Sequence, residues 1–108
     1  MPVKKTSPDT IRSIGAYIAA HPERRFTIVE LSLHFHVRST ALKAAFKAEF
    51  GVTIHQYHLQ VSMQKARQHL EAGQQVKETA LQFGYRHIGN FSRAFKKVHN
   101  TPPESHKQ

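Results

Sequence analysis

The chain has 108 residues, enough for one small domain or two very small subdomains, and this length excludes a large multidomain enzyme. Sixteen lysines and arginines against seven acidic residues give a formal charge of +9, which favours an anionic partner such as nucleic acid. There is no cysteine, and no apolar run approaches the roughly 18 residues of a membrane span. Residues 1–7 lack the apolar core of a signal peptide, so we expect a cytoplasmic protein without a membrane partner.

Three helices are predicted in the first half of the chain. The segment Ser7-Pro8-Asp9 offers a capping hydroxyl, a proline at the first helical position and an acid near the helix dipole, and this helix should end at Ala20. The segment Thr27-Ile28-Val29-Glu30 is a capping box that starts a short helix ending near Phe35. After a break, Ser39 is predicted to cap the third helix.

A long helix and a second set of short helices follow. Thr53 and Gln56 form another capping box, which starts a helix of about twenty residues. From Val76 the pattern begins again with a short helix, a break at Gly84-Tyr85 and another helix. We therefore predict about seven helices in a single domain over residues 1–108, with a first subdomain over 8–51, a linker helix over 53–72 and a second subdomain over 75–108.

The same order of side chains occurs twice in the chain. Leu42-Lys43-Ala44-Ala45-Phe46-Lys47 matches Phe91-Ser92-Arg93-Ala94-Phe95-Lys96, and a sharp break precedes each copy, with one extra residue in the second. Each half therefore reads as helix, tight turn, helix, and the predicted fold class is all-α with two helix-turn-helix subdomains. In such a unit the second helix fits the major groove of DNA.

From about Asp9 to Lys107 the chain resembles the DNA-binding domain of AraC/XylS-type bacterial transcription regulators. The second half carries most of the resemblance, in Gly84-Tyr85, the segment from Asn90 to Lys97, and Thr101-Pro102-Pro103. The first half and the linker match at Leu31, Leu42, Phe46, Lys47, Gly51, Tyr57 and Lys65-Ala66-Arg67.

This resemblance implies transcriptional regulation by sequence-specific binding of double-stranded DNA, with two recognition helices inserted in successive major-groove segments. It also implies two further candidate partners, RNA polymerase and an effector-binding domain in a longer chain. A chain of this length fits both a whole short regulator and the DNA-binding half of a longer one.

Four positions depart from the family pattern. His36 stands where the first turn usually has glycine, and Asn100 replaces the glycine after the last recognition helix, so both need a left-handed backbone or another route. Ser62 replaces an arginine of the linker helix. The segment Glu104-Ser105-His106 lacks the usual tyrosine, and we therefore expect the final short helix to be poorly anchored.

The outward residues of the two second helices are the candidate DNA contacts. Arginine can bridge guanine O6 and N7, asparagine can pair with adenine, and methyl groups can touch thymine, so Arg93, Asn90 and Lys43 are the favoured base readers. The full set of candidate base contacts is Ser39, Thr40, Lys43, Ala44, His87, Ile88, Asn90 and Arg93. The candidate phosphate contacts are Arg38, Lys47, Arg86, Lys96 and Lys97.

Aromatic and aliphatic residues of both halves are predicted to form the core rather than stacking platforms for bases, because their spacing follows the helix period. They are Leu31, Phe35, Leu42, Phe46, Phe83, Tyr85, Phe91 and Phe95. The main alternative function is a basic helical module that docks an acidic protein.

Nine histidines raise the question of a metal site. His34 and His36 flank a turn, and His55 and His58 lie three residues apart, a spacing that can share an ion. Without cysteine, a third ligand at a suitable spacing or a His-Glu-x-x-His motif, we predict neither metal nor other cofactor. The acidic residues are scattered and no nucleophile stands beside a base, so we do not expect an enzyme.

Overall fold

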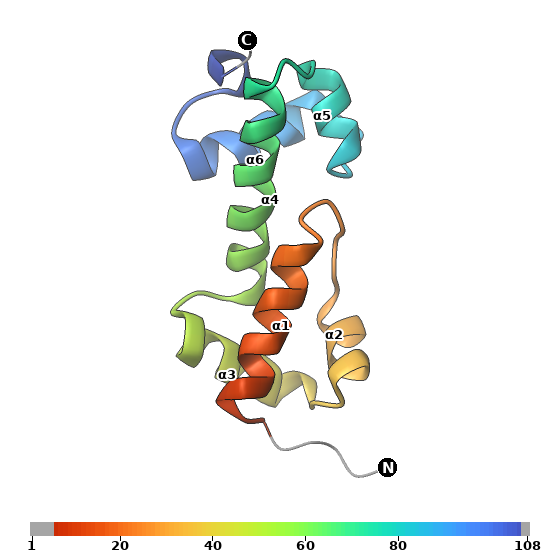
Figure 1. The fold of residues 1–108 in the computed structure, drawn as a ribbon, viewed down its shortest axis with the longest axis vertical. Helices are drawn as coiled ribbons and strands as arrows, with labels where there is room; N and C mark the ends of the chain where they lie inside the picture. Colours follow the sequence, from red (N-terminus) through yellow and green to blue (C-terminus); the bar gives the residue numbers. More distant parts are fainter. Residues whose placement is uncertain (1–5, 107–108) are drawn as a thin grey trace. The chain divides into compact units, whose positions relative to one another are not determined.

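The structure is a computed structural model that describes residues 6–106 and contains six α-helices, one 3-10 helix and, within those residues, no strand (Figure 1). The helices are α1 (Pro8–Ala20), α2 (Ile28–Phe35), α3 (Ser39–Phe50), α4 (Ile54–Glu71), α5 (Val76–Gln82) and α6 (Ile88–His99), followed by the 3-10 helix η1 (Pro103–His106). The predicted all-α class is confirmed.

The chain forms two compact units. Among the described residues, the first contains residues 6–21 and 25–58, and the second contains residues 22–24 and 59–106. Figure 1 shows α1 and α3 beside the first turns of α4, with α2 packed on α1 and α3, and α5, α6 and η1 beside the later turns of α4. Because α4 continues without a break from residue 54 to residue 71, it belongs to both units and joins them in the chain.

The core of the first unit is built on α1. Ile11, Ile14 and Ile18 recur every three or four residues on one side of this helix, and all three are buried. Gly15 is also buried, and a Cβ built at this position would lie 2.3 Å from the ring of Phe50, so a larger residue here would force that ring of α3 to move. The other buried apolar residues of this core are Leu31, Val37, Leu42, Phe46 and Ile54.

The core of the second unit is built around α6. Phe91 and Phe95 of this helix are fully buried, with their ring centroids 5.9 Å apart. They pack with Met63, Ala66 and Leu70 of α4, and with Ala80 and Phe83 at α5. Six of the eight predicted core residues are thus buried, whereas Phe35 and Tyr85 are half-buried at the edges of the two cores.

The predicted helix starts are confirmed at three of four sites. Ser7 Oγ accepts from Thr10 N at 3.2 Å, and the capping boxes at Thr27 and Thr53 are both formed. The prediction for Ser39 is wrong. Arg38 is the N-cap of α3, because its extended backbone places its carbonyl to accept from Leu42 N at 2.8 Å, and Ser39 is already the first helical residue.

The expectation of a poorly anchored C-terminal helix is also wrong. Pro103 is buried, and Thr101 Oγ1 lies 2.7 Å from His106 Nε2. The ring centroid of His106 is 5.4 Å from that of Phe95. His106 therefore anchors η1 where the family pattern has a tyrosine. Ser62, at the position of the family's arginine, is buried and donates its hydroxyl to its own helix.

Candidate nucleic-acid interface

The turn between α2 and α3 is closed by a histidine in the left-handed conformation. His36 has φ 56° and ψ 45°, and its N–H donates to Ser32 O. Val37 N donates to the same carbonyl at 3.0 Å, and Ser32 Oγ donates to Val37 O at 2.5 Å. Val37 is buried, so the turn is held by backbone bonds, a serine hydroxyl and an apolar anchor.

The turn between α5 and α6 contains glycine at the equivalent position and closes with a similar long-span bond. Gly84 has φ 84°, and Tyr85 N donates to Ala80 O at 2.9 Å, which is the same five-residue span as the bond from Val37 to Ser32. Three residues then lead to α6, whereas two lead to α3. The extra residue predicted for the second copy therefore lies in its turn. Asn100, after α6, also adopts the left-handed conformation, with φ 62°.

The outward side of α3 forms the first candidate surface, which we call the α3 face. Lys43 and Ala44 lie three and four residues after Thr40 and four and three residues before Lys47, so all four share one side of the helix, and all four are exposed. Arg38, at the N-cap, is also exposed. Ser39 is half-buried, so among the candidate contacts of this half it is the least accessible.

The outward side of α6 forms the second surface, the α6 face. All seven of its predicted contacts are exposed, namely Arg86, His87, Ile88, Asn90, Arg93, Lys96 and Lys97. Two of the favoured base readers are paired here, because Arg93 Nη2 donates to Asn90 Oδ1. Lys96 and Lys97 lie in the last turn of α6, where the helix dipole favours cations.

The basic side chains of the two faces are not neutralised within the protein. Among residues 6–106, none of the lysines and arginines of these faces takes part in an ion pair. Acidic side chains are engaged elsewhere: Glu49 Oε2 lies 3.0 Å from Arg12 Nε, and Glu71 Oε2 lies 3.1 Å from Arg67 Nε. Both faces therefore present uncompensated positive charge.

Several histidines have packing partners. His34 stacks on Tyr17 with ring centroids 4.9 Å apart, and His58 lies edge-on to Phe26 at 6.4 Å. Within the described part of the chain, no three His, Cys, Asp or Glu residues come together in a way that could hold a metal ion. Over the same residues, no helix combines the length and apolar character needed to cross a membrane.

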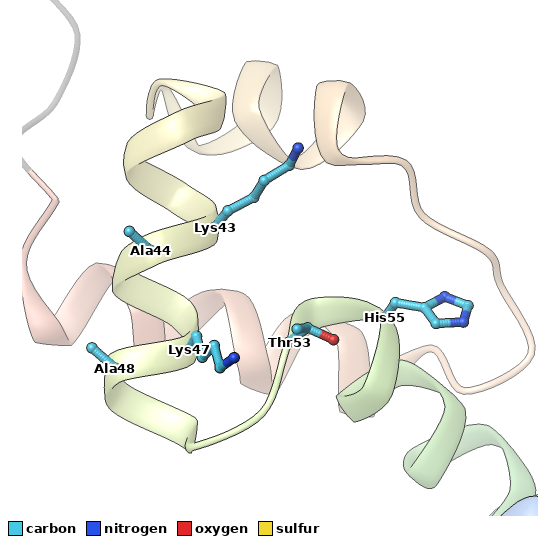
Figure 2. A pocket seen from close by; sticks show the side chains of 6 residues that line it. All are labelled: Lys43, Ala44, Lys47, Ala48, Thr53 and His55. Atoms are coloured by element: carbon cyan, nitrogen blue, oxygen red, sulfur yellow. The ribbon is translucent and has the colours of Figure 1, made fainter.

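A hollow beside the α3 face was not predicted from the sequence. It has a volume of about 620 Å³ and is lined by Lys43, Ala44, Lys47, Ala48, Thr53 and His55. Figure 2 shows Lys43 and Lys47 in one row along α3, Ala44 and Ala48 in another, and Thr53 and His55 at the start of α4. We call it the α3–α4 hollow. The short connection after Gly51 was the only sequence signal that α4 begins beside α3.

Two helix-turn-helix units, each with an exposed cationic second helix, define a DNA-binding domain. The model of a family described as a helix-turn-helix domain matches residues 31–108. The chain therefore belongs to this family, and its resemblance to AraC-type regulators is confirmed by its similarity to known proteins.

Two curated relatives are regulators. The "Probable thc operon regulatory protein" of Rhodococcus erythropolis is 27% identical over 104 residues, covering 93% of this chain and 31% of the relative. The "Probable transcriptional regulator LumQ" of Photobacterium leiognathi is 29% identical over 91 residues, covering 83% of this chain and 37% of the relative. The chain thus spans about a third of the length of these relatives.

Solved structures share the fold over nearly the whole chain. The C-terminal domain of AraT, a response regulator from Geobacillus stearothermophilus, is 25% identical with a TM-score of 0.84, covering 96% of this chain and 87% of that one. The DNA-binding domain of AdpA, a global transcriptional factor solved in complex with a target DNA, is 18% identical with a TM-score of 0.79, covering 93% and 89%. At 18% identity, the similarity to AdpA shows a shared fold and nothing more.

Proposed function

We propose that this chain binds double-stranded DNA sequence-specifically, inserts α3 and α6 into successive major-groove segments, and thereby regulates transcription. The observation that carries the proposal is that each helix-turn-helix unit leaves the face of its second helix exposed, basic and free of internal ion pairs. An α-helix with its side chains fits the major groove, and unpaired lysines and arginines replace counterions on phosphates.

The proposed roles follow from side-chain chemistry. Arg93, Asn90 and Lys43 lead the base contacts, together with Ser39, Thr40, Ala44, His87 and Ile88. Arg38, Lys47, Arg86, Lys96 and Lys97 contact phosphates and set the position of the helices on the duplex. In the free protein Asn90 orients the guanidinium of Arg93, so these two side chains act as a unit when they meet the bases.

The wider assignments belong to the same proposal. Residues 1–108 act as one double helix-turn-helix domain, with subdomains over 8–51 and 75–108 and a linker helix over 53–72. The domain acts in the cytoplasm, where a bacterial chromosome is accessible, and its role is binding rather than catalysis. Because the chain spans about a third of its curated relatives, an effector-binding domain in a longer chain is a further proposed partner. RNA polymerase is proposed as a partner from the role in transcription alone.

Salt titration tests the electrostatic part of the proposal. If the two faces neutralise about six to ten phosphates, the logarithm of the binding constant should fall against the logarithm of salt with a slope of about −0.9 per phosphate. The measurement is fluorescence anisotropy with random duplex and with a duplex selected from genomic fragments. Absence of duplex binding at moderate salt contradicts the proposal and favours a basic module that docks an acidic protein.

Matched substitutions on α6 test the division between base and phosphate contacts. Arg93→Ala should weaken binding of the selected duplex by about 1–3 kcal/mol and binding of random DNA much less, because a bidentate contact to guanine distinguishes the selected sequence from others. Lys97→Ala should weaken binding of both duplexes alike and reduce the steepness of the salt dependence by about one. Equal effects of the two variants on both duplexes would contradict these roles.

A further inference from the structure

The α3–α4 hollow has the chemistry of a site for an anionic group attached to an apolar one. Three of its six lining residues carry basic side chains, Lys43, Lys47 and His55, and no acidic residue lines it. The other lining includes the methyl groups of Ala44 and Ala48, and the alkyl stems of the lysines add apolar surface. Its volume of about 620 Å³ lies in the range of ligand sites.

The hollow depends on two alanines that the second copy lacks. When the two repeats are aligned on Phe46 and Phe95, Ala44 and Ala48 occupy the positions of Arg93 and Lys97. Long cationic side chains therefore extend from α6 at the two positions where α3 has only methyl groups. The first copy has open space beside its recognition helix at those positions.

The helix start at Thr53 does not itself supply the binding groups. Thr53 Oγ1 accepts from Gln56 N at 3.1 Å, and Thr53 N donates to Gln56 Oε1 at 3.0 Å, so the capping box uses both groups. The side chains of Lys47 and His55, which are both exposed, remain as donors on either side of Thr53 (Figure 2). An anion in the hollow would be held by these side chains.

We propose that the α3–α4 hollow seats one sugar-phosphate unit of the DNA strand that borders the groove entered by α3. Lys47 and His55 donate to the phosphate, and Ala44 and Ala48 contact the deoxyribose, whose carbon atoms match an apolar wall. This inference rests on the proposed function and extends it, because it adds His55 and Ala48 to the interface and gives Ala44 a sugar contact beside its proposed base contact. The contact is independent of base sequence.

Filling the hollow without changing charge is the first test. Ala48→Leu adds bulk at an exposed helical position, and Ala16→Leu makes the same change at an exposed position of α1 as the matched control. By anisotropy, we expect Ala48→Leu to raise Kd about tenfold for selected and random duplexes alike, as the loss of one charge-assisted contact does. Ala16→Leu should leave Kd unchanged, and circular dichroism should show that both variants are folded.

Neutralising single phosphates locates the contact. A series of duplexes is prepared, each with a methylphosphonate at a different single position. At one position the substitution should raise the Kd of the wild type but leave the Kd of Lys47→Ala and of His55→Ala unchanged. Lys65→Ala, an exposed lysine of α4 outside the hollow, should keep the wild-type pattern. Binding of inorganic phosphate is followed through the NMR signals of His55. Inorganic phosphate should compete only weakly with the duplex, because it lacks the sugar.

The outcomes separate this inference from the proposed function. Duplex binding with wild-type affinity by Ala48→Leu, or the absence of any phosphate coupled to both Lys47 and His55, overturns the hollow and leaves DNA binding in place. Inorganic phosphate that still shifts the His55 signals when the protein is saturated with duplex also overturns it, since DNA would then not occupy the hollow. If the wild type binds no duplex at all, both proposals fail together.

Discussion

The two helix-turn-helix copies close their turns with the same five-residue backbone bond but by different chemical means. In the second copy Gly84 adopts the left-handed conformation without a Cβ to hinder it, and Ala80 supplies only its carbonyl. In the first copy His36 adopts that conformation at a cost of about 1–2 kcal/mol for a residue with a Cβ. The Ser32 hydroxyl, at the position of Ala80, donates to Val37 O and offsets about 1 kcal/mol of that cost.

The faces of the two second helices differ as well. The α6 face places Arg93 and Lys97 where the α3 face has Ala44 and Ala48, while Lys96 and Lys47 occupy equivalent positions. The common basic residue suits the proposed phosphate contact in both copies, and the unequal positions give α6 a guanidinium, that of Arg93, for the proposed base contact. The repeat therefore conserves how a helix is held and varies what the helix offers to a ligand.

The largest expected effect comes from a residue that the two copies share. Phe95→Ala should lower the free energy of unfolding by about 3–5 kcal/mol, because the ring is fully buried and its loss leaves a cavity. Urea denaturation measures this, and Phe46→Ala should cost a similar amount because Phe46 is equally buried. Leu33→Ala, 70% exposed, should stay within about 0.5 kcal/mol of the wild type. A small loss for Phe95→Ala would mean that α6 is not anchored as described.

The second copy should depend on its glycine. Gly84→Ala forces a Cβ into the left-handed region and should destabilise the protein by about 1–2 kcal/mol in the same denaturation experiment. Ala72→Gly, at an exposed position outside either turn, serves as a control for changes in chain entropy. A neutral Gly84→Ala would show that the second turn can take another route.

The first copy should depend on its serine. Ser32→Ala removes the hydroxyl that donates to Val37 O and should lower the free energy of unfolding by about 1 kcal/mol. Ala80 already lacks this hydroxyl, so the variant gives the first turn the same side chain as the second at this position. The backbone still differs, because His36 remains where the second turn has Gly84. If the loss disappears when Ser32→Ala is combined with His36→Gly, the hydroxyl acts by supporting the histidine.

The smallest expected effect is a gain. His36→Gly relieves the left-handed strain but increases the chain entropy lost on folding, so we expect stabilisation of about 0.5 kcal/mol. Thermal unfolding followed by circular dichroism detects a change of this size as a shift in Tm. Destabilisation instead would show that the His36 side chain makes contacts that outweigh its backbone strain.

Much of the fold could be predicted from the sequence because the signals are local. The capping boxes and the apolar spacing of α1 each involve residues only a few positions apart, and the structure confirms them. Ser39 was misassigned because the N-cap is set by backbone angles, and Arg38 takes that role without a side-chain bond. His106 was missed because its partners, Thr101 and Phe95, are contacts of the folded chain.

The candidate site was predicted less completely. Exposure of the charged side chains follows directly from the helix period, so twelve of the thirteen candidate contacts are exposed as expected, with Ser39 half-buried. The α3–α4 hollow could not be predicted, because it exists only where the start of α4 comes beside α3 in space. His55 was considered only for metal binding, since a spacing along one helix says nothing about a neighbouring helix.

The unequal faces of α3 and α6 have one more consequence. Regulators built as symmetric dimers present two copies of one helix and read palindromic sites. If α3 and α6 both read DNA as proposed, one chain offers two different recognition helices without two-fold symmetry, so its binding site need not be palindromic and the bound complex has a direction along the double helix. Reversing the site at a promoter would then turn the protein around, so that each recognition helix faces the opposite way.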